Sequence, residues 1–468
     1  MMKPSLSCVI FSFVTVFFIQ CSSKYNDNIE IVLDGVGNKR GDLEAVLEHY
    51  VMPADSLKRK AAYFLVENFP EDQVQTIDKQ LMIENIELAF EVWKKPWAKH
   101  LNFDEFKELV LPFNLERDST GTFWRKRFMD EYAFVEDSLK KYPQEDPAAA
   151  ACTIVNNVLK TKYSFEFDME NPDIKDLNDW ERNRSGDCAG ISSLTNHIMH
   201  AVGVPTSQIF TPQWANLNFR HYWNIVLVNH RFLPFMGGDA SPRQYKVEFS
   251  TFYYYHKTQP KVYRITYAIN RKTLPFISGK EPIPRNFRDK HIIDESKKYI
   301  PTTNFSISVP DSINQKFVYL CVPQSQSWAP VCWGEVSNNK VIFTDIRPGV
   351  IYATCIYVNG KMRLFNNPFL LTKVGSKRFF IPDPQIVEKV ICDRKFPADD
   401  TNLIKIGDIY ELFYWNRFAW HSLGKKVATN TYIPFENAPK NALLYLKNHT
   451  RGFEERVFFC KDGKQCFI

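Results

Sequence analysis

Residues 41–160 carry apolar positions at the spacing of amphipathic helices. Leu43, Val46, Leu47 and Tyr50 follow one another at intervals of three or four residues, which places them on one helical face. Further runs with this period cover residues 57–68, 80–93, 123–141 and 148–159. The pattern predicts a helical N-terminal segment.

A more strongly apolar helix is expected at residues 188–202. Its buried positions recur at helical spacing: Ile191, Leu194, Ile198 and Val202. Ser185 or Asp187 can cap the beginning of this helix, because both side chains accept hydrogen bonds from free backbone N–H groups. Gly203 and Pro205 suit its end.

After this helix, apolar and polar residues alternate along the chain, which is the pattern of β-strands. Residues 219–228 predict a strand with four side chains on one face: His221, Trp223, Ile225 and Leu227. A turn at residues 229–231 leads into a second strand at 232–236.

Beyond residue 245 the chain consists of short alternating or apolar runs separated by turn residues. These runs cover residues 246–255, 262–269, 305–309, 316–323 and 331–371, and later 410–415, 431–435, 442–447 and 456–460. Their spacing predicts two antiparallel β-sandwich-like domains. Pro382, Asp383 and Pro384 look like the linker between them.

A chain of 468 residues exceeds one hydrophobic core, and the patterns divide it into five segments. We expect a signal peptide at 1–21, a helical segment at 41–145, a core domain at 146–255, and β domains at 256–381 and 385–468. The predicted fold class is α+β.

The first residues are expected to direct export. Lys3 precedes an apolar run at residues 9–19 that is too short to span a membrane stably. The run ends at Gln20 and Cys21 and is followed by polar residues. This arrangement resembles a bacterial lipoprotein signal, in which the cysteine is lipidated and anchors the protein to the cell envelope. An ordinary secretory signal with an incidental cysteine is the alternative.

Charge and cysteine usage exclude several classes of protein. The formal net charge is only +6, and basic and acidic residues are interspersed, so no nucleic-acid partner is expected. No group of cysteines and histidines has the spacing of a zinc site, and we expect neither a metal nor a cofactor. Cys460 and Cys466 flank a predicted turn at Asp462 and Gly463. A two-residue turn there would place Cys460 opposite Gln465 and prevent a disulfide.

Cys188 is the strongest candidate for a catalytic nucleophile. It stands in the first turn of the predicted helix, where free N–H groups and the helix dipole favour a thiolate. A nearby histidine would lower the pKa of this thiol further. The alternative is that Cys188 is a small buried apolar residue.

His221 and Asp239 are the candidates for the base and for the residue that orients it. If Asn229, His230 and Arg231 form a three-residue loop, Asp239 lies directly opposite His221. A two-residue turn would place Gly238 opposite His221 and send Asp239 to the wrong face. His221 could instead be a hydrogen-bonded core residue and Asp239 a turn residue.

The residues Gly186-Asp187-Cys188, Gly203-Val204-Pro205, His221-Tyr222-Trp223-Asn224 and Asp239 together resemble the transglutaminase-like superfamily, a branch of the papain-like cysteine fold. The resemblance covers about residues 147–243. It implies a core in which the cysteine-bearing helix packs on an antiparallel sheet. It also implies Cys188 as nucleophile, His221 as acid and base, and Asp239 as orienting residue. Gly190 departs from the family, which often has an aromatic residue there.

Two functions follow as hypotheses. The first is a cysteine-dependent hydrolase or acyl transferase that forms a thioester on Cys188 with a protein or peptide substrate, which includes glycopeptides and peptidoglycan peptides. The second is a non-catalytic cell-surface protein that binds glycan or peptide on an inherited scaffold. The first needs a reactive thiol, and the second does not.

Overall fold

The computed structural model describes residues 24–112, 123–166, 177–245, 249–250, 255–395, 403–451 and 455–468. The predicted signal peptide with Cys21, and most of the predicted strand at 246–255, lie outside these residues. In the described part, no helix is both long and apolar enough to cross a bilayer.

The N-terminal segment is helical, as predicted, and begins earlier than residue 41. Its helices are α1 (Asp27–Gly35), α2 (Arg40–His49), α3 (Ser56–Glu67), α4 (Lys79–Val92), α5 (Phe103–Leu109), α6 (Trp124–Glu131), α7 (Val135–Ser138) and α8 (Pro147–Lys162). Short 3-10 turns connect some of them: η1 (Gly37–Lys39), η2 (Pro53–Asp55), η3 (Glu71–Thr76) and η4 (Leu139–Lys141). Leu43, Val46 and Leu47 are buried on one face of α2, which confirms the helical stripe.

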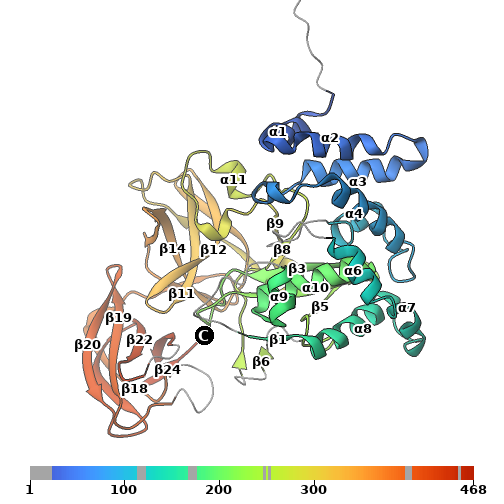
Figure 1. Cartoon of the computed structure of the whole chain (residues 1–468). Helices are drawn as coiled ribbons and strands as arrows, with labels where there is room; N and C mark the ends of the chain where they lie inside the picture. Colours follow the sequence, from blue (N-terminus) through green and yellow to red (C-terminus); the bar gives the residue numbers. More distant parts are fainter. Residues whose placement is uncertain are drawn as a thin grey trace, which may run out of the picture.

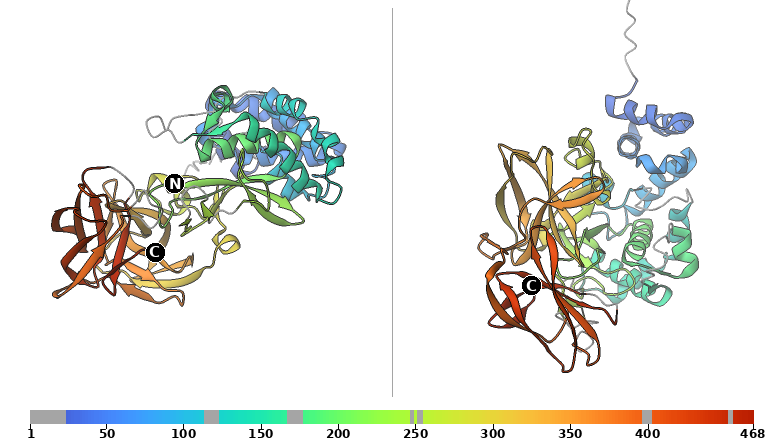
Figure 2. Two further views of the ribbon diagram at one scale, coloured as in Figure 1. Left: turned by 90° about the horizontal axis from the view of Figure 1, so that it is seen from below. Right: turned by 90° about the vertical axis from the view of Figure 1, so that its left-hand side faces the viewer.

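The central helix α10 (Cys188–Val202) packs between strands on one side and other helices on the other. Next to it lies a five-stranded antiparallel sheet in the order β5-β4-β3-β8-β9. Its strands are β3 (Thr206–Thr211), β4 (His221–Val228), β5 (Arg231–Phe235), β8 (Tyr263–Ile265) and β9 (Ile292–Asp294). Figure 2 shows the helices gathered on one side of this sheet and the two β domains away from them.

The sheet extends beyond the expected end of the core domain at residue 255. Strand β8 pairs with β3 through Ile209 and Arg264, and β9 pairs with β8. A boundary at 255 would therefore cut the sheet between strands that are hydrogen-bonded to each other, so it was placed too early. The linking region also contains α9 (Leu177–Asn183), α11 (Leu274–Ile277), η5 (Arg285–Phe287), α12 (Ser296–Tyr299) and the two-residue strands β1 (Ser164–Phe165), β2 (Ser185–Gly186), β6 (Phe249–Ser250) and β7 (Tyr255–His256).

Arg125 of α6 joins the helical segment to the C-terminal end of α10. Its side chain is buried, and its guanidinium donates to the His200 carbonyl at 2.6 Å and to the Asn85 side chain at 2.6 Å. Trp97 donates to the Val202 carbonyl at 2.8 Å. The last carbonyls of a helix lack partners within the helix, and these side chains donate to two of them, which ties the C-terminal end of α10 to the helical segment.

Two β domains of sandwich or barrel type follow (Figure 1). The first contains β10 (Thr303–Ser308), β11 (Phe317–Gln324), β12 (Ser327–Ser337), β13 (Lys340–Ile346), β14 (Val350–Val358), β15 (Lys361–Leu364), β16 (Phe369–Leu371) and β17 (Lys377–Phe379). The second contains β18 (Asp383–Cys392), β19 (Ile409–Asn416), β20 (Ala419–Val427), β21 (Ile433–Lys440), β22 (Leu443–Asn448), β23 (Val457–Lys461) and β24 (Lys464–Cys466). The expected linker is not a separate segment, because Asp383 already pairs with Lys440 at the start of β18.

Candidate functional site

The local sequence places Cys188 at the first position of α10. The Asp187 side chain caps the helix by accepting from the Gly190 N–H at 2.8 Å, and Gly203 ends it with a φ of 84°. Every residue of α10 is buried, because the sheet covers one side of the helix and α4, α6 and α8 lie around the rest. The cap and the glycine stop expected from the sequence are both present.

The Cys188 thiol does not have the low pKa that its helix position predicts. The side chain is only 8% exposed, and burial raises the pKa of the thiol to about 11. The Asp187 carboxylate raises the pKa further, while N–H donation from the Tyr222 backbone lowers it. Desolvation outweighs the helix terminus, so at neutral pH the thiol keeps its proton.

His221 begins β4, and its imidazole is held by aromatic neighbours. It stacks on Trp214 with ring centres 5.5 Å apart and on Trp223 at 5.7 Å. Its Nε2 forms a hydrogen bond with the Tyr245 hydroxyl at 2.8 Å. Burial lowers the pKa of His221 to about 3, with a further contribution from the Lys257 charge, so the ring is neutral.

Cys188 and His221 approach the same end of β4 without a direct hydrogen bond. The thiol receives the N–H of Tyr222, the residue that follows His221. Asn224, on the same face of the strand as Tyr222, donates to the Ser192 carbonyl of α10 at 2.8 Å. Among the described hydrogen bonds none joins the thiol to the imidazole.

Asp239 does not lie opposite His221. Asn229 and His230 form a two-residue turn with φ values of 48° and 59°, so Val228 pairs with Arg231. Both residues adopt the left-handed conformation that matches the twist of a tight hairpin, although neither is glycine. The prediction of a three-residue loop was therefore wrong, and β5 ends at Phe235, before Asp239.

Asp239 instead sits at the exposed tip of a turn after β5, with its N–H donating to the Met236 carbonyl at 3.0 Å. Burial raises the pKa of Tyr245, and the negative charge of Asp239 adds to this shift; burial lowers the pKa of Lys257, and the Asp239 charge opposes that shift. The charge of a Cys188 thiolate would act on both of these groups in the same direction. The predicted trio is thus linked electrostatically through Tyr245 and Lys257.

Tyr245 and Lys257 are site residues that the sequence did not indicate. Tyr245 lies 24 residues after the histidine that it binds. The Lys257 ammonium lies 5.3 Å from the centre of the Trp214 ring, and burial lowers its pKa. Neither residue belongs to a periodic pattern or a motif, so only the fold brings them to the site.

The turn that carries Asp239 is hydrogen-bonded to helix α8 and to strand β4. The Gly238 N–H donates to Asn156 of α8 at 2.8 Å, and Gly237 donates to Asn224 at 3.3 Å. A Cβ atom added at Gly237 would lie 1.9 Å from Oγ1 of Thr195 on α10. Glycine at this position allows the close approach, and the turn is held against the cysteine-bearing helix.

Four other histidines and cysteines that the sequence singled out are His197, His200, Cys460 and Cys466. His197 and His200 of α10 each bond a backbone carbonyl at 2.9 Å, and the described residues contain no cluster of three or more side chains fit to hold a metal. Cys460 pairs with Gln465 across a two-residue turn, as that turn length predicts. Both Cys460 and Cys466 are free thiols.

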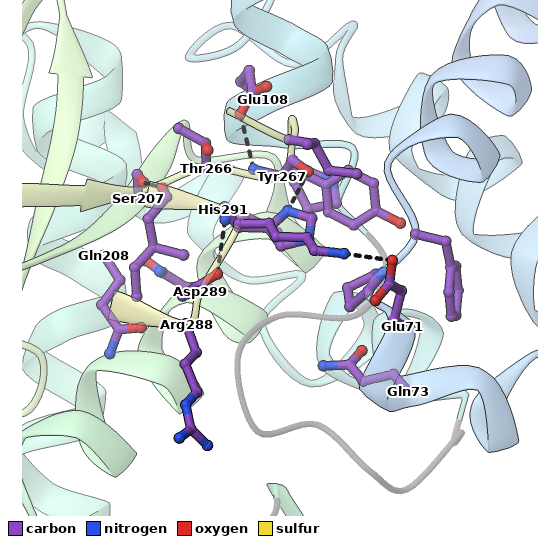
Figure 3. A pocket seen from close by; sticks show the side chains of 18 of the residues that line it. Glu71, Gln73, Glu108, Ser207, Gln208, Thr266, Tyr267, Arg288, Asp289 and His291 are labelled. Carbon is purple, nitrogen blue, oxygen red and sulfur yellow. Dashed lines mark hydrogen bonds and ion pairs between the residues drawn. The ribbon is translucent and has the colours of Figure 1, made fainter. Parts of the chain in front are cut away.

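A cavity of about 490 Å³ lies at the other end of α10, between the helical segment and the sheet edge (Figure 3). Two of its acidic side chains have partners within the protein: Glu71 forms a salt bridge with Lys290 at 2.6 Å, and Glu108 accepts the Tyr267 N–H at 3.1 Å. His291 bonds the Tyr267 carbonyl at 2.9 Å. None of the predicted catalytic residues lines this cavity.

A scan against protein-family models and a search of the curated proteins found no match. Among solved structures, the chain is similar to a candidate cysteine protease from Cytophaga hutchinsonii, with a TM-score of 0.19 and 14% identity over 25% of this chain and 40% of that one. It is also similar to red sea bream transglutaminase, with a TM-score of 0.20 and 8% identity over 77% and 70% of the two chains. At these scores neither likeness establishes a shared fold.

Proposed function

We propose that this protein is a cysteine-dependent hydrolase of amide or peptide bonds. The observation that carries the proposal is that the thiol of Cys188, at the start of α10, accepts the N–H of Tyr222, the residue next to His221 at the start of β4. A buried thiol and a histidine at adjoining element ends are the parts that nucleophilic catalysis requires. The resemblance of the motifs around both residues to transglutaminase-like proteins supports the same chemistry.

In the proposed reaction the resting pair is neutral. His221 takes the thiol proton as Cys188 attacks the carbonyl carbon, and the C–N bond then breaks as the imidazolium returns this proton to the leaving amine. Water, deprotonated by His221, attacks the thioester, and the acid product and the free thiol are released. The Cys188 backbone N–H, in the first turn of α10, is the proposed donor to the tetrahedral oxyanion.

For this reaction the His221 ring has to exchange its Tyr245 hydrogen bond for the thiol. Lys257 would stabilise the thiolate by its charge, and Asp239 would favour the imidazolium if the ring turns toward it.

Thiol labelling tests the proposal. Cys188→Ala is expected to abolish both labelling by an iodoacetamide probe at this site and hydrolysis of a fluorogenic peptide library, while its circular dichroism spectrum matches wild type. Cys152→Ala is the control, because Cys152 is also a buried thiol, on α8. Equal hydrolysis by wild type and Cys188→Ala would contradict the proposal.

The second candidate is a binding protein that no longer uses the thiol. The observation that favours it is the hydrogen bond between the Tyr245 hydroxyl and the Nε2 atom of His221. This bond occupies the nitrogen that would otherwise accept the thiol proton. A protein that binds peptide or glycan yet accumulates no thioester, as measured by intact mass after an acid quench, would support this candidate. For either function, export with a lipid anchor at Cys21 is part of the proposal.

A further inference from the structure

A second cavity lies where the two β domains meet, at the ends of β12, β15 and the β19–β20 hairpin. Its volume is about 810 Å³. None of Cys188, His221, Tyr245, Lys257 and Asp239 lines it. It is therefore separate from the proposed catalytic site.

The charge of this cavity is of one sign. Arg285, Lys361 and Arg363 line it, and no aspartate or glutamate is among its lining residues. None of the three takes part in a salt bridge with another residue of the described chain. Cations without partners around a cavity attract an anionic ligand.

One wall is a rigid cluster of indole rings. Trp328 of β12 meets Trp415 of β19 edge to face with centres 5.8 Å apart, and Trp415 meets Trp420 of β20 in the same way at 5.1 Å. Trp328 and Trp415 are buried in the contact between the domains. Such a wall contributes apolar contact area without loss of side-chain freedom on binding.

Strand β15 offers a free backbone edge to the cavity. It pairs with β14, and with no other described strand. All four of its residues line the cavity although their side chains alternate, which requires that the cavity run along the strand edge. Asn359 and Gly360 form a two-residue turn, so Lys361 and Arg363 bond to β14 while the N–H and C=O groups of Met362 and Leu364 point outward.

Phe418, at the tip of the β19–β20 turn, has a strained backbone conformation and an apolar side chain that is exposed to solvent. Its φ is 65°, in the left-handed region that bulky residues avoid, and its side chain is 52% exposed. It lines the same cavity. Strain and exposed apolar area together at one residue are retained where a binding surface requires them.

We propose that this cavity binds an acidic peptide segment in extended conformation, which adds as a strand to the free edge of β15. The backbone of the peptide would pair with Met362 and Leu364, its carboxylates would lie by Lys361, Arg363 and Arg285, and an apolar side chain would pack against Phe418 and the tryptophans. The site goes beyond the proposed hydrolysis, because binding here needs no thiol. If the hydrolase proposal holds, acidic peptides are the substrates that this site selects.

Fluorescence anisotropy with a labelled octapeptide of alternating glutamate and valine tests the proposal, with Cys188→Ala protein so that the peptide is not consumed. Binding is expected to be at least about tenfold tighter than for the lysine–valine peptide of the same length, and at least about tenfold weaker after N-methylation of alternate amides. The double variant Lys361→Glu/Arg363→Glu should lose at least about tenfold in affinity. The matched control Lys297→Glu/Lys340→Glu, which reverses two exposed charges elsewhere, should stay within about twofold.

Phe418→Gly separates binding from folding. Glycine accepts the left-handed turn, so this variant should unfold at equal or higher urea concentration than the parent while it binds the peptide several-fold more weakly. Equal binding of the glutamate and lysine peptides would overturn the proposal. An affinity for the N-methylated peptide equal to that for the unmethylated peptide would also overturn it. Tighter binding of an oligogalacturonate than of the glutamate peptide would overturn it as well and would assign the cavity to an acidic glycan. Loss of hydrolysis in other experiments would leave these binding results unaffected.

Discussion

The Nε2 atom of His221 is hydrogen-bonded to the hydroxyl of Tyr245 at 2.8 Å, and not to the thiol of Cys188. The protein therefore holds its candidate base on one partner while the candidate nucleophile stays protonated next to the Tyr222 N–H. In the proposed enzyme this is the resting arrangement, in which neither candidate group is charged.

Removal of the Tyr245 hydroxyl should release the base. In Tyr245→Phe the His221 Nε2 loses its partner and can accept the Cys188 proton, so iodoacetamide labelling of Cys188 at pH 7 should rise several-fold. Mass spectrometry of the Cys188 peptide measures the rate. Tyr352→Phe, which removes a hydroxyl bonded to the Arg347 carbonyl at 2.9 Å in a β domain, should leave it unchanged. Slower labelling in Tyr245→Phe would show that Tyr245 orients His221 for the reaction.

The alkylation rate of Cys188 should rise steeply with pH. Burial raises the pKa of its thiol to about 11, and only the thiolate reacts. The rate should increase about tenfold for each pH unit between 7 and 9 and show no plateau in that range. A peptide thiol with an ordinary pKa levels off above pH ~9 and serves as the reference. A plateau already at pH 7 would instead reveal a thiolate–imidazolium pair.

Acid should destabilise the protein through His200. This side chain is 1% exposed, and burial lowers its pKa to about 3 in the folded state. Between pH ~6.5 and 3 the unfolded chain binds a proton at this residue and the folded chain does not, so the free energy of unfolding falls as pH falls, by up to ~1.4 kcal/mol per unit. Urea unfolding of wild type and His200→Gln at pH 7 and pH 5 measures the effect. The variant should lose less stability between the two pH values than wild type does.

Gly237→Ala should destabilise the turn that carries Asp239. The added Cβ would lie 1.9 Å from the Thr195 Oγ1, so the turn or α10 has to move, at a cost of about 1–3 kcal/mol in the free energy of unfolding. Gly41→Ala on α2 is the control, since no atom lies within 4 Å of its added Cβ. That control should be neutral or slightly stabilising, because alanine favours a helix over glycine. Equal stability of both variants would contradict the close packing at Gly237.

The sequence by itself determined the elements that carry Cys188 and His221. The apolar stripe, the Asp187 cap and the Gly203 stop define α10, and alternation defines β4, because these signals depend on residues within a few positions of each other. The same holds for the helical character of the N-terminal segment and for the Asp-Gly turn that keeps Cys460 and Cys466 apart.

Tertiary structure alone decided how these elements meet. Asn229 and His230 adopt a left-handed turn without glycine, which shifted the hairpin by one residue and removed Asp239 from its expected place. Burial reversed the direction of the Cys188 pKa shift that the helix terminus predicts. Tyr245, Lys257 and strands β8 and β9 reach the core from distant parts of the chain, and local periodicity holds no information on contacts between segments so far apart.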